Sequence, residues 1–345
     1  MPTASHMYAP RGVWLDDEHL VVCDTGNHRI LIWNDPENLS SHGDADVVLG
    51  QPDFTTEGAQ AGGRGPDGGL RLPTGVLVHD GRLVVADAWN HRILIWNDVP
   101  TSSDRAPDVV LGQSDSTSVD ENRGGGCDTR SFYWPFGIAM VGGRFHVADT
   151  GNRRVLVWDG LPEPDDEPAV VLGQATGAVR DENRGELGPD SFRWPHSIAG
   201  TDSLVVVADA GNHRVLGWQP APTADGPADF VLGQTDFVTG SEFPYIPQTP
   251  MSMRFPYAVD IDDDTMVVAD TANNRILVWD TVPTQSTTPA DRVLGQPDFA
   301  SNGENRWDAV AADTFCWPYG LSLHRGRLAV TDSGNNRVTV WDLVP

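Results

Sequence analysis

The stretch VVCDTGNHRILIW, at residues 21–33, recurs in nearly the same form six times along the 345-residue chain. The other copies are VVADAWNHRILIW (84–96), HVADTGNRRVLVW (146–158), VVADAGNHRVLGW (206–218), VVADTANNRILVW (267–279) and AVTDSGNNRVTVW (329–341). The aspartate of each copy follows the previous one after 60 to 63 residues. Self-similarity at a fixed period of this kind is the signature of a repeat protein.

Two further signatures recur in register with the first. Each copy is preceded by a proline segment: APRGV, LPTGV, WPFGI, WPHSI, FPYAV or WPYGL. Five copies are followed by a segment of the form xVLGQ, as in residues 47–51 and 109–113. Three signatures in register over the whole chain define one repeat unit.

Each repeat is predicted to form four short β-strands. In the second repeat, the apolar run 75–78 ends at the turn residues His79-Asp80-Gly81, and 83–86 and 92–96 follow as two further strands. The VLGQ segment supplies the fourth. Four antiparallel strands per repeat, repeated radially, are typical of a β-propeller. We therefore predict an all-β, six-bladed propeller and a single domain over residues 1–345.

The predicted blades cover residues 8–54, 70–115, 132–176, 192–237, 253–299 and 315–345. No VLGQ segment follows the sixth copy, so the sixth blade is expected to contain three strands of its own. Its outer edge, near Val338-Thr339-Val340, would then be unpaired. We expect this edge to be paired with residues 2–7 or covered by self-association or a partner, because an open edge invites strand addition.

The repeated residues suit structural roles. In residues 24–29 an aspartate ends one strand and an arginine begins the next, so the two can pair across the hairpin. Glycine and asparagine between them tolerate the positive φ of a tight turn. The six closing tryptophans, from Trp33 to Trp341, provide the bulk to fill the wedge between blades.

The motif residues, seen as Asn27-His28-Arg29 and Asn90-His91-Arg92, resemble the NHL-repeat family. The resemblance covers essentially residues 8–345. Within the family, the chain is similar to a bacterial subgroup with long, VLGQ-containing blades. It implies a six-bladed propeller. It also implies an enzymatic alternative, because peptidylglycine amidating lyase is a six-bladed NHL relative that uses histidines at a central metal, and other six-bladed propellers are calcium-dependent lactonases or esterases.

Composition argues against some partners. The formal net charge is −26, and every basic residue is an arginine. Nucleic-acid affinity comes mainly from cations that displace counterions from phosphates, so we expect no nucleic-acid partner, including the RNA bound by animal NHL domains. An anionic membrane is disfavoured for the same reason, and no apolar run approaches the ~20 residues of a membrane span.

The three cysteines and the N-terminus bear on localisation. Cys23, Cys127 and Cys316 form no CxxC pair and are an odd number, which favours a reducing compartment. No signal peptide is visible at the N-terminus. The expectation is a cytoplasmic protein.

A binding site should lie where the six repeats differ. The position after each proline is expected where the first strand enters the central channel. There the repeats carry Arg11, Thr74, Phe136, His196, Tyr257 and Tyr319. This mixture suits a small polar ligand or an inserted side chain, and the alternative is a water-filled mouth without a ligand.

Four other residues are candidates for partner contacts on the same face. Arg123, Arg184 and Arg306 each follow a Glu-Asn pair, and arginine can bind a carboxylate or phosphate. The recurrence equally suggests that they pin their own loops. Trp89 replaces a turn glycine, and an indole at an exposed hairpin tip is a credible contact for a partner.

A metal site is the weaker hypothesis. Asp16, His79, Asp262 and His324 share one repeat position in consecutive blades and are legitimate ligands for zinc or calcium. The position lies in a turn, where aspartate and histidine also serve the turn itself. We expect no cofactor and no catalytic residue, because GxSxG, HExxH and Walker motifs are missing.

The sequence therefore favours a non-enzymatic binding or scaffold propeller that holds a protein, peptide or small polar ligand around its channel. The alternative is a metal-dependent lyase or lactonase-like hydrolase with a site in the channel. His196 is the one histidine expected at the channel mouth, which falls short of the three-histidine site of the lyase.

Overall fold

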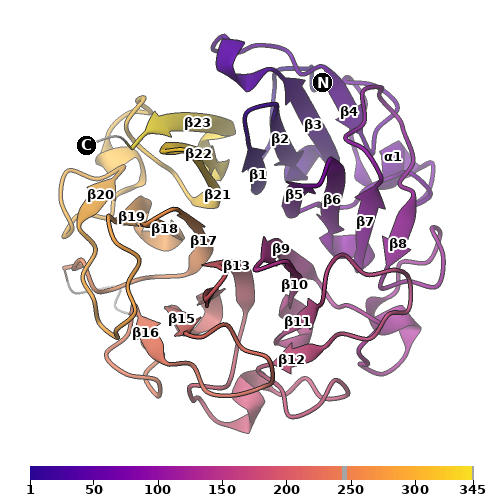
Figure 1. Ribbon diagram of the computed structural model, residues 1–345. Helices are drawn as coiled ribbons and strands as arrows, with labels where there is room; N and C mark the ends of the chain where they lie inside the picture. The colour runs from indigo at the N-terminus through magenta and orange to yellow at the C-terminus, as the bar shows by residue number, and fades with distance from the viewer. Residues whose placement is uncertain (243–246, 344–345) are drawn as a thin grey trace.

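The computed structural model describes residues 1–242 and 247–343, whose strands form six sheets arranged radially around a common centre (Figure 1). Five sheets contain four antiparallel strands, and the sheet of the sixth blade contains three. The predicted all-β, six-bladed propeller is confirmed. The last two residues of the predicted domain, 344 and 345, lie outside the described part.

Blade one consists of β1 Gly12–Leu15, β2 His19–Asp24, β3 Arg29–Asn34 and β4 Val47–Leu49. Blade two consists of β5 Gly75–His79, β6 Arg82–Asp87, β7 Arg92–Trp96 and β8 Val109–Leu111. Blade three consists of β9 Pro135–Val141, β10 Arg144–Asp149, β11 Arg154–Trp158 and β12 Val170–Leu172.

Blade four consists of β13 Pro195–Thr201, β14 Leu204–Asp209, β15 Arg214–Trp218 and β16 Phe230–Leu232. Blade five consists of β17 Pro256–Asp262, β18 Thr265–Asp270, β19 Arg275–Trp279 and β20 Arg292–Leu294. Blade six consists of β21 Pro318–His324, β22 Arg327–Asp332 and β23 Arg337–Asp342.

Helical structure is confined to single turns in the loops. The one α-helical turn is α1 Ala59–Gly63 in the described residues. The 3-10 turns are Thr25–Asn27, Pro36–Asn38, Ala88–Asn90, Glu121–Gly124, Thr150–Asn152, Glu182–Gly185, Ala210–Asn212, Thr271–Asn273, Glu304–Trp307 and Ser333–Asn335. Within the described residues, no helix is long and apolar enough to cross a lipid bilayer.

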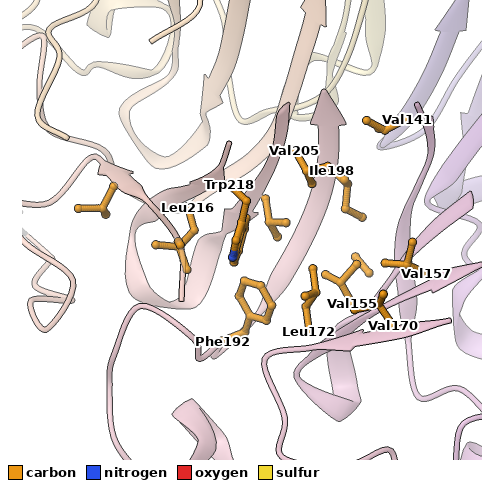
Figure 2. Packing of buried hydrophobic residues seen from close by; sticks show 14 residues of the cluster. Val141, Val155, Val157, Val170, Leu172, Phe192, Ile198, Val205, Leu216 and Trp218 are labelled. Atoms are coloured by element: carbon orange, nitrogen blue, oxygen red, sulfur yellow. The ribbon is translucent and has the colours of Figure 1, made fainter. Parts of the chain in front are cut away.

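The hydrophobic core lies between the blades. It consists of six clusters, and each combines apolar residues from two neighbouring blades. Figure 2 shows the cluster between blades three and four, where the rings of Phe192 and Trp218 are 6.1 Å apart. Five of the closing tryptophans are buried, as predicted, and Trp341 of blade six is partly exposed.

The ring closes where blade six meets blade one (Figure 1). The backbone N–H of Leu15 donates to Ser322 Oγ, 2.9 Å away, between the two inner strands β1 and β21. The N–H of Ala9 donates to Asn336 Oδ1 at 2.8 Å. Side chains, rather than a strand shared between the ends of the chain, therefore join the first and last blades.

The N-terminal segment does not close the sixth blade. Arg29 Nη2 of blade one donates to the carbonyl oxygens of Thr3 and His6, and the N–H of Ala45 donates to Ala4 O. The expectation that residues 2–7 pair with β23 is therefore wrong, because buried Arg29 binds their carbonyls on blade one. Val340 of β23 is 46% exposed, and its sheet has no fourth strand in the described residues.

Candidate functional site

The six residues that follow the prolines surround the mouth of the central channel. Together with the next one or two residues of each blade, they line a cavity of about 90 Å³; the six are Arg11, Thr74, Phe136, His196, Tyr257 and Tyr319. The inner strands approach closely behind them, since a Cβ on Gly137 would lie 2.3 Å from His196 O. The structure thus brings together all six predicted positions; their role in binding stays a prediction.

Four of these side chains form a continuous stack along the channel wall. The ring centroids of Phe136 and His196 are 4.5 Å apart, and those of His196 and Tyr257 are 4.6 Å apart. Tyr257 stacks on Tyr319 at 4.5 Å with an interplanar angle of 17°. Separations in this range are those that aromatic pairs prefer. The mouth therefore presents ring faces and edges from four consecutive blades.

Two rings of this stack, those of His196 and Tyr257, have pKa values shifted towards the neutral form. His196 Nδ1 lies 3.0 Å from the carbonyl oxygen of Trp194, so this nitrogen carries the proton and Nε2 keeps a lone pair. Burial lowers the pKa of His196 to about 4, and the charge of Arg11 acts in the same direction. Burial and the neighbouring Tyr319 raise the pKa of Tyr257. The imidazole of His196 and the phenol of Tyr257 are thus uncharged near pH 7.

Arg11 is the cation of the mouth. Its guanidinium carbon lies 4.6 Å from the ring centroid of Tyr319, in a cation–π contact. Its Nε is buried and has no hydrogen-bond acceptor among the described residues. Of the described residues that line the cavity, Arg11 is the one with a permanent charge.

A second set of aromatic residues lies next to the mouth, directly before the prolines. We call Trp134, Trp194, Phe255 and Trp317 the outer aromatic residues. Trp194 stacks on Phe255 with centroids 6.4 Å apart. Trp194 and Trp317 are 37% and 40% exposed. Exposed tryptophans of this kind are frequent anchors in protein interfaces.

Trp89 belongs with these residues and is not an exposed tip. Its ring centroid lies 5.4 Å from Trp134 and 5.7 Å from Phe136 in the next blade, and the side chain is half-buried. The expectation of an indole at an exposed hairpin tip is wrong, because blade three supplies two aromatic neighbours.

The three loop arginines lie away from the mouth and are paired with acidic residues. Arg123 bonds to Asp165 at 3.1 Å and Arg306 to Asp313 at 2.8 Å. Arg184 lies 2.9 Å from Asp190 and 2.8 Å from Asp225. None of them lines the cavity at the mouth. Their geometry favours the alternative that they pin their own loops, and a role in ligand binding has no support here.

The four metal-ligand candidates lie at the ends of the first strands, beside the turns to the second strands, and find separate partners. Asp16 accepts from Trp14 Nε1 at 2.8 Å. His79 Nε2 lies 3.4 Å from Asp80 Oδ2, and His324 Nε2 lies 2.9 Å from Asp17 Oδ1. Asp262 accepts the N–H of Arg325. In the described part of the chain, no three histidine, cysteine or carboxylate side chains are grouped as metal ligands.

Sequence reasoning missed one partly buried carboxylate in an inner strand. Asp260 accepts the N–H of Leu323 in the next blade at 2.6 Å and that of Ile261 at 2.8 Å. Burial raises its pKa to about 7, against the opposite effect of the two hydrogen bonds. A repeat-by-repeat comparison signals this residue, because the other blades carry Trp14, Leu77, Ala139, Ala199 and Ser322 at its position.

Residues 70–96, which span the first three strands of blade two, match the family model of the NHL repeat. The second blade is an NHL repeat. Its motif is structural, as predicted: Arg92 Nε and Asn90 Nδ2 both donate to Asp87 Oδ2 at 2.8 Å, and all three side chains are buried. Arg92 also donates to the carbonyl oxygens of Ser116, Pro66 and Gly69. The motif of this NHL repeat therefore ties two loops to the blade.

One of three similar solved structures shares the fold of this propeller at low sequence identity. The WD40 β-propeller domain of Doa1 is 11% identical with a TM-score of 0.52, over 99% of this chain and 95% of that one. The computationally designed Ika8 protein is 11% identical with a TM-score of 0.45, over 99% and 98%. A chain of the nidogen/laminin complex is 16% identical with a TM-score of 0.44, over 79% and 76%. No curated protein matches the sequence significantly.

Proposed function

We propose that this propeller is a non-enzymatic binding protein that holds a protein, peptide or small polar ligand at the face around its channel mouth. One observation carries the proposal. The six blades agree on the buried residues that build them, yet at the mouth they carry five different residue types. Function in repeat folds resides in such grafted differences rather than in the shared scaffold.

The outer aromatic residues favour a protein or peptide as the main ligand. Trp194 and Trp317 expose large flat surfaces beside the cavity, and aromatic anchors dominate binding energy in protein interfaces. An acidic side chain accompanies Trp317, since Glu304 accepts from its Nε1 at 3.0 Å, and Arg193 lies 5.0 Å from the ring centroid of Trp194. With a formal net charge of −26, the surface favours a partner with exposed basic groups over a nucleic acid.

The enzymatic alternative has less support from the residues present. A metal-dependent lyase or hydrolase needs several metal ligands that converge on the channel. The described lining residues of the mouth include one imidazole, that of His196, and no carboxylate. This donor set does not fit a three-histidine site, so we derive no step through a metal.

Two further proposals concern the setting of the protein. A reducing, cytoplasmic location is supported by its three free cysteines, Cys23, Cys127 and Cys316. The outer edge of β23 would take an additional strand from another copy of the chain or from a partner, because Val340 is exposed there and the backbone of an edge strand is unpaired.

The binding proposal is tested by affinity capture with matched variants. The double variant Trp194→Ser/Trp317→Ser removes two exposed indoles, and Asp263→Ser changes an exposed residue in the turn after β17. A partner captured by the wild type and by Asp263→Ser, but lost by the double variant, is the expected result. Identical partners for all three proteins would contradict the proposal. A purified partner then gives the affinity change directly.

A further inference from the structure

The guanidinium of Arg11 differs from those of the repeated arginines. In blades one to five, the motif arginine is buried and its Nε donates to the motif aspartate, as Arg29 does to Asp24 at 2.7 Å. Arg11 has no such pair in the described residues, and its Nε is enclosed without an acceptor. A buried donor without a partner is costly, and a charged one more so. An anion bound at the mouth would supply the counter-charge that Arg11 lacks.

We propose that the channel mouth binds a carboxylate carried on or next to a flat ring, with Arg11 holding the carboxylate and the stacked side chains holding the ring. This inference rests on the proposed binding function and names the ligand chemistry of the same site. Arginine matches a carboxylate with two parallel N–H···O bonds, which a single-point cation cannot do.

The neutral members of the lining explain why the anion should carry a ring. Tyr319 already lies under the guanidinium, and Tyr257, His196 and Phe136 continue the stack from it. Aromatic faces and edges attract a further ring through offset or edge-to-face contact. A ligand ring beside Arg11 would extend this series.

The polar atoms of the lining limit what else the ligand can carry. His196 Nε2 is an acceptor, because Nδ1 is committed to Trp194 O. The hydroxyl of Thr74 donates to Phe136 O at 3.1 Å and is therefore occupied as a donor. Among the described lining residues no carboxylate competes for Arg11. A hydrogen-bond donor of the ligand would bind to His196 Nε2, and a carboxylate of the ligand would bind to Arg11.

The size of the cavity sets the size of the group that enters. A volume of about 90 Å³ corresponds to roughly six to nine waters, at about 10–15 Å³ for each. One ring with one carboxylate matches this room. Two sources carry this chemistry, namely the C-terminal residue of a peptide that ends in phenylalanine or tyrosine, and a free aromatic acid.

The test compares acids with their neutral amides on the intact protein. Benzoate and benzamide represent the free acid, and N-acetyl-Ala-Phe with a free or amidated C-terminus represents the peptide. Binding is measured by calorimetry or ligand-observed NMR up to about 10 mM, which covers weak, millimolar affinity. Wild type should bind each acid at least about tenfold more tightly than its amide, since charge-assisted bonds are the stronger ones.

The variants separate the charge from the ring. Arg11→Met should weaken acid binding by about tenfold and abolish the preference over the amide. Tyr319→Phe keeps the ring and should bind like the wild type, whereas Tyr319→Leu should lose affinity. Arg82→Met, at the start of β6, removes an arginine that lines no part of the mouth and should change nothing. Melting temperatures check that each variant is folded.

Tighter binding of N-acetyl-Ala-Phe than of benzoate would identify a peptide C-terminus as the source, and tighter binding of benzoate would identify a free aromatic acid. No binding of either acid up to about 10 mM, equal binding of acids and amides, or acid binding unaffected by Arg11→Met would each overturn the inference. The proposed function is tested by a separate result. It would survive the loss of this inference if partner capture still depended on Trp194 and Trp317, and it would fall if capture did not.

Discussion

The imidazole Nδ1 of His213 in blade four accepts the backbone N–H of Phe255 in blade five, 3.2 Å away. Phe255 precedes a proline and has a φ of +51°, a conformation that is unfavourable both for a non-glycine residue and before proline. The same contact recurs with His28, His91, Asn274 and Asn336 as acceptors. Where Arg153 occupies this position there is no such acceptor, and Trp194 is the one residue before these prolines without a positive φ.

Replacing this acceptor should weaken the joint between two blades. His213→Ala removes the lone pair that Phe255 needs, and we expect a loss of about 0.5–1.5 kcal/mol or more in the free energy of unfolding. His213→Asn should restore most of it, because Asn274 and Asn336 perform the same role in other blades. Thermal or urea unfolding measures both. Equal losses for the alanine and asparagine variants would contradict the role of the acceptor.

The same contacts predict sensitivity to acid. Burial lowers the pKa of His91 to about 4, and burial also lowers the pKa values of His28 and His213. Each must stay neutral to accept its hydrogen bond. Since the folded-state pKa lies below the unfolded value of about 6.5, this stabilisation is complete above pH 6.5 and is lost as the pH falls through about 4. Unfolding measured between pH 7 and 4 should show a shallower decline for His91→Asn than for the wild type.

Asp260 should act in the opposite direction. Its folded-state pKa of about 7 lies above the ordinary value of 3.8, so its contribution is complete at low pH and is lost as the pH rises through about 7. Asp260→Asn keeps an oxygen acceptor for the N–H of Leu323 without the buried charge. We expect it to be more stable than the wild type at pH 8, by about 1–3 kcal/mol, and no more stable near pH 4. A stability difference that does not vary with pH would exclude this account.

The buried ion pair of the repeat should respond as a unit. Arg154 and Asp149 are both fully buried, with Nε and Oδ2 2.8 Å apart. Arg154→Met leaves a buried carboxylate without its cation and should cost about 3–5 kcal/mol, whereas Arg154→Met/Asp149→Asn should cost less than the two single changes together. The surface pair Arg130–Glu167 is the control, and Arg130→Met should cost less than about 1 kcal/mol. Additive losses in the double variant would argue against coupling.

Self-association is tested at the edge of β23. Val340→Lys places a charge on the exposed edge, where lysine disfavours strand addition, and should reduce any dimer seen by sedimentation. Val238→Lys, at a residue that is 69% exposed in a loop, is the matched control. If the wild type sediments as a monomer at high concentration, association of two copies of the chain through this edge is excluded.

Repetition decides which features the sequence could predict. The pair formed by Asp24 and Arg29 recurs in each blade, and the closing tryptophan is buried in five of the six, so one physical reason explains repeated observations and the fold follows. The mouth positions were also predictable, because they depend on the fold alone. Single contacts were not: the rings around Trp89 come from another blade, and Arg29 captures residues 3 and 6 through backbone carbonyls that no side-chain pattern encodes.

The hydrogen bonds between neighbouring blades also could not be predicted from the sequence. The residues of the motif that vary between histidine, asparagine and arginine look interchangeable in the sequence. In the structure they differ in whether they can accept a hydrogen bond, and that difference sets the backbone of the neighbouring blade. Recognising it requires knowing which N–H faces each side chain, which only the folded ring reveals.

The residue after each proline contributes its side chain to the mouth, whereas the buried motif of the blade carries the packing. Evolution or a protein engineer can therefore change the recognition surface by substituting the residues after the prolines, while the packing between the blades is retained. A chain that keeps its motif aspartates, arginines and tryptophans would stay folded while its ligand changes. The ring of Arg11, Thr74, Phe136, His196, Tyr257 and Tyr319 is then one setting among many that the same scaffold could display.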